Sequence, residues 1–225
     1  ASLGQIRGVE WIRLLYCHPR GISYELIQTI RDEPAVCKYL DTAIEHADDA
    51  VLARMNRGLT QAAMRERIAA LRAAIPGIAL RTSVIVGFPG ETEAAFNTLL
   101  AFLKAVRFER LGAFRYSNEE VSAAFRLPDQ VPEAVKRRRL DRLMRVQQAI
   151  AAEVNARDIG RTCDVLIDEP DPDDPRQFIG RTRTDCPEVD GVVYVQSDRP
   201  LAPGALVPVR ITDSYEYDLV GTAVS

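Results

Sequence analysis

Residues 81–92 read RTSVIVGFPGET, from Arg81 to Thr92. The apolar, β-branched run at 84–86 predicts a short parallel strand that is buried on both faces. Gly87 and Gly90 allow a sharp turn and a close approach to a ligand, and the proline between them stiffens it. Ligands of α/β folds lie at the carboxyl ends of such strands, so we expect this turn to border a ligand site. On spacing alone, the segment also fits an ordinary strand-to-helix turn.

Strands and helices alternate on both sides of this segment, up to about residue 157. Strands are expected at 9–16, 36–44, 78–86 and 111–116. Asp48 and Thr60 are expected to cap two of the helices between them. This alternation predicts a parallel sheet with covering helices. A long amphipathic helix is expected at 132–157, with a run of basic residues that we interpret as a solvated face: Lys136, Arg137, Arg138, Arg139, Arg142 and Arg145.

After Gly160 the hydrophobic period changes to two, with alternating apolar residues at 163–167, 207–211 and 215–219. About five short antiparallel strands separated by turns predict a small closed β-barrel. The expected fold class is therefore α/β followed by a small antiparallel β-barrel. The expected domains are residues 1–158, which include the linker helix 132–157, and residues 159–225.

Composition and charge indicate in which cellular compartment the protein lies and which kinds of partner it can bind. The 225 residues carry a net charge of −3. No apolar stretch approaches the ~20 residues that span a bilayer, and no signal peptide is visible, so we expect a cytoplasmic protein without a membrane partner. Residues 160–225 hold six Arg, no Lys and thirteen acidic residues, a net charge of −7, against +4 for residues 1–159. Such an acidic module favours a basic partner and disfavours RNA, although acidic surfaces also serve solubility.

Local groups of reactive residues give only weak evidence for a catalytic or metal site. Cys17 and His18 are adjacent on a strand and so point to opposite faces, which disfavours a nucleophile–base dyad. His46, near Asp41 and Glu45, fits a hydrogen-bond network better than a metal site. The four cysteines show no CxxC or CxxxC spacing, so neither a disulfide framework nor a local metal knuckle is expected. We assign no catalytic residue and no metal ligand.

The order of several segments is more specific than any one of them. They read WIRLLY at 11–16, KYLD at 38–41 leading to His46, MNRG at 55–58, VGFPGET at 86–92, LPDQVP at 127–132, and PEVDG at 187–191. In this order they closely resemble the RimO family, radical S-adenosylmethionine methylthiotransferases that modify an aspartate of small-subunit ribosomal protein twelve. The resemblance covers essentially the whole chain.

The resemblance implies a partial (β/α) TIM-like barrel of the radical S-adenosylmethionine type, followed by an OB-like TRAM barrel. It implies that S-adenosylmethionine is bound near Glu45, Arg81, Gly87, Phe88 and Glu91. It further implies that a basic small-subunit ribosomal protein docks on the acidic TRAM domain. In the full-length family, a 4Fe-4S cluster held by CxxxCxxC reduces the cofactor to a radical that abstracts hydrogen, and a second cluster helps to install the methylthio group.

This chain departs from the family pattern in three places. CxxxCxxC is absent, so the chain alone, interpreted as the C-terminal portion of such an enzyme, is expected to be inactive. Residues 43–45 are Ala-Ile-Glu where Pro-Leu-Gln is usual, and residues 118–124 replace a typical Arg-Glu-Glu-Gly-Thr-Pro-Ala. Two other functions stay open: a transfer-RNA methylthiotransferase of the sister group, and a non-catalytic protein-binding module.

Overall fold

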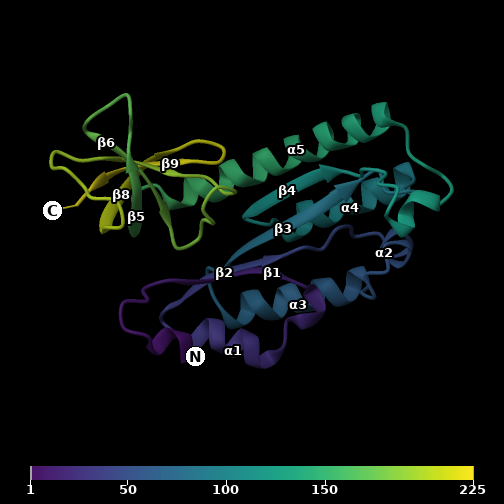
Figure 1. Cartoon of the computed structure of the whole chain (residues 1–225), viewed down its shortest axis with the longest axis horizontal. Helices are drawn as coiled ribbons and strands as arrows, with labels where there is room; N and C mark the ends of the chain where they lie inside the picture. The colour runs from purple at the N-terminus through teal and green to yellow at the C-terminus, as the bar shows by residue number, and fades with distance from the viewer. Residues whose placement is uncertain (1, 225) are drawn as a thin grey trace.

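The computed structural model describes residues 2–224, which form a parallel sheet with covering helices and a separate small barrel (Figure 1). The sheet has the order β1-β2-β3-β4 and is parallel throughout, which confirms the α/β expectation. Its strands are β1 (Ile12–Cys17), β2 (Val36–Thr42), β3 (Ala79–Val86) and β4 (Arg110–Arg115). The α-helices are α1 (Tyr24–Asp32), α2 (Asp49–Arg54), α3 (Gln61–Ala74), α4 (Glu93–Val106) and α5 (Glu133–Asn155). Short 3₁₀ helices are η1 (Ser2–Gln5), η2 (Pro19–Gly21), η3 (Ala123–Arg126) and η4 (Ala156–Asp158).

Capping residues begin four of the five α-helices. Asp48 accepts hydrogen bonds from the backbone N–H groups of Ala50 and Val51, and Thr60 accepts one from Ala63, as predicted. Ser23 and Thr92 cap α1 and α4 in the same way. Each side-chain oxygen satisfies an N–H group that the first turn leaves without a partner. Local sequence therefore determines where these helices begin.

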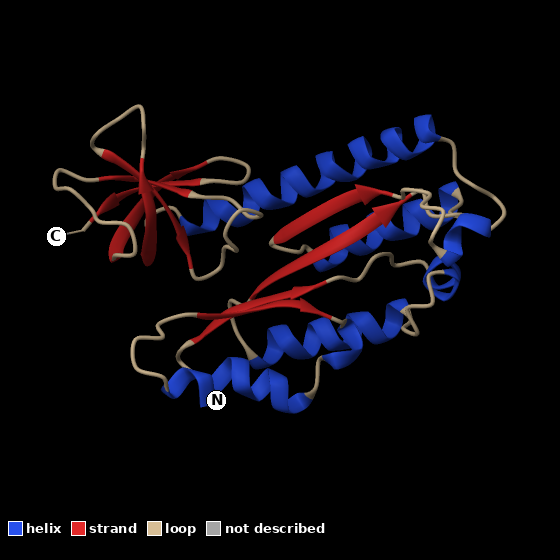
Figure 2. Cartoon of the chain, in the orientation of Figure 1, coloured by secondary structure: helices blue, strands red, loops and turns tan. Residues whose placement is uncertain are grey.

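The main core lies on one face of the sheet. Leu40, Leu80 and Val84 point toward helices α1, α3 and α4, and all belong to one buried apolar cluster. The opposite face is half-buried at Arg81, Ser83 and Ile85, so the expectation that β3 is buried on both faces is wrong. The reason is that helices cover only one face of this four-stranded sheet (Figure 2). We call the uncovered surface the open face.

The second unit is a closed barrel with strand order β5-β6-β7-β9-β8. Its strands are β5 (Thr162–Pro170), β6 (Gln177–Thr182), β7 (Val193–Gln196), β8 (Leu206–Ser214) and β9 (Leu219–Ala223). Five strands were predicted, but the pairing of β7 with β9 is parallel, so the barrel is not wholly antiparallel. The alternation expected at 215–219 is also partly wrong: Tyr215 donates its N–H to the Asp218 carbonyl in a turn between β8 and β9. Closure of the barrel satisfies both edges of the sheet.

Helix α5 connects the two units and lies along β4 and α4 (Figure 1). The barrel lies where the strands of the sheet begin, and the strand arrows point away from it (Figure 2). Two basic residues of α5, Lys136 and Arg139, are buried beside the residue 87–91 turn, so the expected solvated basic face is wrong at these positions. Within residues 2–224, no helix combines the length and apolarity that crossing a bilayer requires.

Candidate cofactor site at the carboxyl edge of the sheet

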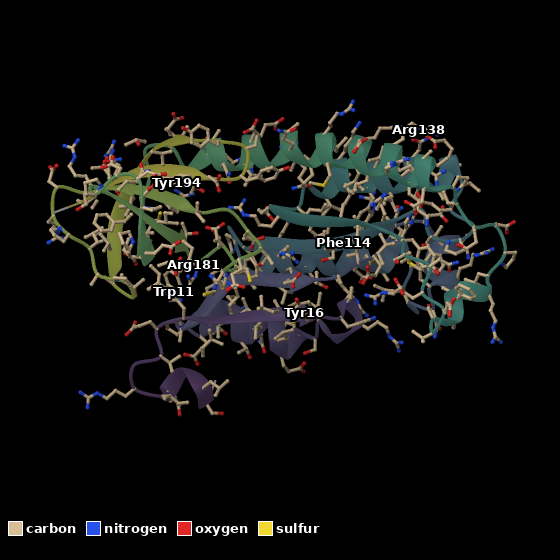
Figure 3. The ribbon with its side chains drawn as sticks, turned by 45° about the horizontal axis from the view of Figure 1, so that its top comes forward. Trp11, Tyr16, Phe114, Arg138, Arg181 and Tyr194 are labelled. Atoms are coloured by element: carbon tan, nitrogen blue, oxygen red, sulfur yellow. The ribbon has the colours of Figure 1, made fainter. Side chains whose placement is uncertain are left out.

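The strand register determines which side chains share the open face. Arg81 pairs with Asp41 on β2 and with Arg110 on β4, and Ile85 pairs with Phe114. Partners in a parallel ladder lie on the same face, so the open face carries a polar centre and an apolar rim. Phe114 is 56% exposed and Tyr16, just before the end of β1, is 86% exposed. Figure 3 shows these two labelled side chains on strands at the two edges of the sheet.

Glu45 lies at the carboxyl edge, just beyond β2. Its backbone accepts a hydrogen bond from Ile85 N at 2.8 Å and donates one to Ser83 O at 3.0 Å, so the residue continues the sheet for one bridge. Its carboxylate is 21% exposed and lies 4.0 Å from Arg57. Burial raises the pKa of Glu45, and Arg57 opposes that rise. A partly exposed carboxylate in this position is suited to accept hydrogen bonds from hydroxyl groups of a ligand.

Gly87 and Gly90 both have positive φ angles, of 76° and 83°. A Cβ on Gly87 would lie 2.3 Å from Lys136 Cγ, and one on Gly90 would lie 2.6 Å from Arg54 Cζ. The close approach that these glycines permit is therefore to side chains of α5 and α2. The backbone conformation favours glycine at both positions. At Gly87 the packing against the Lys136 stem also requires it, whereas the Arg54 guanidinium is the end of a flexible side chain and can move away from Gly90.

Phe88 and Glu91 brace the same turn from inside. The Phe88 ring packs edge to face on Tyr116, with the centroids 5.1 Å apart. The Glu91 carboxylate is fully buried, accepts a hydrogen bond from Gly87 N, and lies 3.4 Å from Arg139. Burial raises the pKa of Glu91 to about 7, although hydrogen bonds from the turn and the charge of Arg139 oppose the rise. These two residues shape the edge from inside. The Phe88 ring is packed on Tyr116, and the Glu91 carboxylate is not exposed to solvent.

Arg81 lies near the start of β3, and its guanidinium is held between two carboxylates. Its Nη1 is 3.1 Å from Asp41 Oδ1, and its Nε is 3.3 Å from Asp190 Oδ1 of the barrel unit. Burial lowers the pKa of Arg81, but the two carboxylates raise it by more. Arg81 therefore stays charged and links the sheet to the barrel. Cofactor binding by any of the five proposed residues stays a prediction.

The weaker candidates engage separate partners. The Cys17 thiol donates weakly to Leu15 O at 4.0 Å, whereas His18 Nδ1 accepts from Arg20 N. His46 is fully buried, its Nδ1 accepts from Asp48 N at 3.0 Å, and burial lowers its pKa to about 4. In residues 2–224, no three His, Cys, Asp or Glu side chains are arranged to hold a metal ion. The residues described therefore do not fit a 4Fe-4S cluster.

A cavity of about 500 Å³ lies where the barrel meets the sheet, near the amino ends of β3 and β4. Arg72, Glu109 and Arg110 line it from the sheet unit, and Cys163 and Thr182 line it from the barrel. Both arginine and acidic side chains line its wall. It lies at the opposite end of the strands from Glu45 and the Gly87 turn.

Comparison with known proteins assigns both units. Residues 4–103 match the family model of the Radical SAM superfamily, and residues 159–224 match that of the TRAM domain. The chain is 48% identical to ribosomal protein uS12 methylthiotransferase RimO of Desulfitobacterium hafniense, over 99% of this chain and 50% of that protein. RimO of Geotalea uraniireducens is 49% identical, again over 99% of this chain and 50% of that protein.

The chain is RimO-like over its whole length. It spans about half the length of the curated relatives that it matches. Among solved structures, coproporphyrinogen III oxidase (HemN) of Escherichia coli shares the fold, with a TM-score of 0.50 and 14% identity. That match covers 77% of this chain and 46% of HemN. The expected fold of a partial barrel of the radical SAM type followed by a TRAM barrel is thereby confirmed.

Several residues that shape the site were missing from the prediction. Ile85 and Phe114 on the open face were read only as strand residues, and the register of β3 with β4 brings them together. Lys136 and Arg139 looked like solvated charges because they belong to a basic run. Their positions continue the helical stripe of the buried Leu143, Gln147 and Ile150 toward the start of α5, and this alignment is the signal that would have singled them out.

Proposed function

We propose that this chain supplies the S-adenosylmethionine-binding edge and the TRAM domain of a radical SAM methylthiotransferase that acts on an aspartate of ribosomal protein uS12. The whole-chain identity to RimO proteins carries the proposal. The division into residues 1–158 and 159–225 is part of it, with residues 1 and 225 outside the described structure. A cytoplasmic site of action is part of it too, as the ribosomal substrate requires.

The residues at the carboxyl edge fit S-adenosylmethionine. The ligand combines an aromatic base, a ribose with two hydroxyl groups and a charged amino acid moiety. Glu45 offers a carboxylate for hydroxyl groups, and Ile85 and Phe114 offer apolar surface for a base. When bound, this cofactor supplies the radical chemistry of the family. Gly87, Phe88 and Glu91 hold the shape of the edge, and Arg81 fixes the polar centre of the open face.

Calorimetric titration of the chain with S-adenosylmethionine tests this assignment. Glu45→Ala should weaken binding by about tenfold, because it removes the acceptor of a charge-assisted hydrogen bond, which contributes about 1.5 kcal/mol or more. Glu120→Ala is the matched control, since Glu120 is an exposed carboxylate of the segment that follows β4. Equal effects of the two substitutions, or no saturable binding by the unmodified chain, would refute the assignment.

The docking partner is proposed from the negative charge of the barrel surface. Most barrel carboxylates face solvent, but Asp185 and Asp190 are buried against Arg110 and Arg81, so these two contribute nothing to an acidic docking surface. The exposed set includes Asp164, Asp173, Asp198 and Asp213. A strongly basic ribosomal protein complements this surface, whereas a phosphate backbone is repelled by it.

Binding of the full chain to purified uS12 and, separately, to transfer RNA across a salt series tests the partner. Replacing Asp164, Asp173, Asp198 and Asp213 together by Asn should weaken uS12 binding and flatten its salt dependence. The matched control neutralises four exposed carboxylates of the other unit: Glu10, Glu66, Glu120 and Asp141. Selective binding of transfer RNA would favour the sister group instead, and binding to neither would remove the docking proposal.

A further inference from the structure

The segment between β6 and β7 of the barrel lies against the amino ends of the sheet strands. Its Cys186 packs in a buried cluster with Cys37, Tyr39 and Ala79, and Trp11 covers that cluster. In the same segment, Asp185 pairs with Arg110 at 2.6 Å. These contacts anchor the segment. The second carboxylate of the segment, Asp190, contacts a different arginine, Arg81 of β3.

Asp190 is 2% exposed at its side chain and meets three groups. Its Oδ2 accepts hydrogen bonds from Tyr39 Oη and from Cys186 N, both at 2.8 Å. Its Oδ1 lies 3.3 Å from Arg81 Nε. The carboxylate is therefore held by its own segment and by β2, and it presents one oxygen to Arg81.

Arg81 passes this constraint across the open face, from β3 to β2 and β1. Its Nη1 donates to Asp41 Oδ1 at 3.1 Å, and Asp41 Oδ2 accepts from Tyr16 N at 3.2 Å. Tyr16 has a positive φ of 57°, which is unfavourable for a tyrosine, so this hydrogen bond stabilises a strained backbone. One continuous set of contacts thus joins Asp190 of the barrel to Tyr16, near the carboxyl end of β1.

We propose that Asp190 is a positioning residue for the cofactor edge, acting through Arg81 and Asp41 on the backbone of Tyr16. The expected effect on cofactor binding rests on the proposed function, because Tyr16 lies on the rim of the open face where S-adenosylmethionine is proposed to bind. It assigns the TRAM unit a role in shaping the radical SAM unit, in addition to docking a partner.

Nuclear magnetic resonance of the ¹⁵N-labelled full chain tests the positioning step without any ligand. Asp190→Asn keeps the size of the side chain and its acceptor oxygen but removes the charge that holds Arg81. It should shift both the Tyr16 amide signal and the Arg81 Nε–H signal. Glu188→Gln is the matched control, because Glu188 lies in the same segment and is exposed. It should leave both signals in place.

Titration with S-adenosylmethionine forms the second arm. Asp190→Asn should weaken binding by about threefold to tenfold, with no change for Glu188→Gln. If no variant binds the cofactor but the Tyr16 signal moves, the proposed function fails and the positioning link stands. An unmoved Tyr16 signal in a folded Asp190→Asn protein would overturn the link. If that variant does not fold, Arg81→Lys tests the same link from its centre, and an unmoved Tyr16 signal there overturns it equally.

Discussion

Glu91 and Arg139 form a buried pair, with Glu91 Oε1 3.4 Å from Arg139 Nη1, although 48 residues separate them in the chain. Arg139 Nη1 also donates to the Glu91 carbonyl at 3.0 Å. The pair ties the Gly-Phe-Pro-Gly turn to helix α5. A basic residue from a run that looked solvent-facing thus supports the turn that borders the proposed cofactor edge.

The first prediction concerns pH. The Glu91 pKa of about 7 lies above the value of 4.5 expected in the unfolded chain. Between these values the folded state holds a proton that the unfolded state has lost, so stability falls as pH rises from about 4.5 to about 7. The loss from this group should reach about 3 kcal/mol at most. Urea unfolding at a series of pH values measures it. Glu91→Gln should remove this part of the slope, and an unchanged slope would contradict the assignment.

The second prediction separates backbone strain from packing. Gly87→Ala should lower the free energy of unfolding by about 2–4 kcal/mol, the sum of a left-handed alanine and a clash with Lys136. Gly77 is the matched control: its φ is 77°, and a Cβ there would meet nothing within 4 Å. Gly77→Ala should therefore cost only about 1 kcal/mol. Thermal or urea unfolding of both variants measures the difference, and equal costs would show that Lys136 moves aside freely.

A third prediction tests whether the basic run of α5 is structural. Lys136 Nζ donates to Tyr116 O at 2.8 Å and pairs with Glu133 at 2.9 Å. Lys136→Met keeps the stem against Gly87 but leaves that carbonyl without its donor, so it should cost about 1–3 kcal/mol of unfolding free energy. Arg138 points outward from α5 (Figure 3), and Arg138→Met should stay within about 0.5 kcal/mol of the unmodified chain. The opposite ranking in urea unfolding would restore the interpretation of a solvated face.

The fourth prediction concerns the contact between the units. Arg110 is buried and also donates to Asn155 Oδ1 at 3.1 Å. Arg110→Met should destabilise the chain by about 3–5 kcal/mol, because it leaves the Asp185 carboxylate buried without its cation. The double variant with Asp185→Asn should cost less than the two single variants added together. Arg161→Met, in the exposed pair with Asp158, is the control and should cost at most about 1 kcal/mol. Strict additivity would mean that Arg110 and Asp185 do not interact energetically.

The proposed site was predictable only in part. The position of the turn follows from its two glycines and from the strand before it. The burial of Glu91 does not, because a glutamate in the first turn of a helix is usually solvated. Its surroundings come from α5, which begins about forty residues later. The half-buried open face was missed for a related reason, since an apolar run cannot show how many of its faces neighbouring elements cover.

By itself, the sequence determined the order and type of the elements of the α/β unit, the caps at Asp48 and Thr60, the change from an α/β unit to a barrel, and the similarity to RimO proteins. These depend on periodicity and on contacts between residues close in the chain. Only the tertiary structure decided that β7 pairs parallel with β9, that Lys136 and Arg139 are buried, and that Arg81 is shared between Asp41 and Asp190. The pair of Arg110 and Asp185 shows why, since 75 residues separate its members. A charged side chain carries no local sign of whether its partner will be water or a carboxylate from a distant segment.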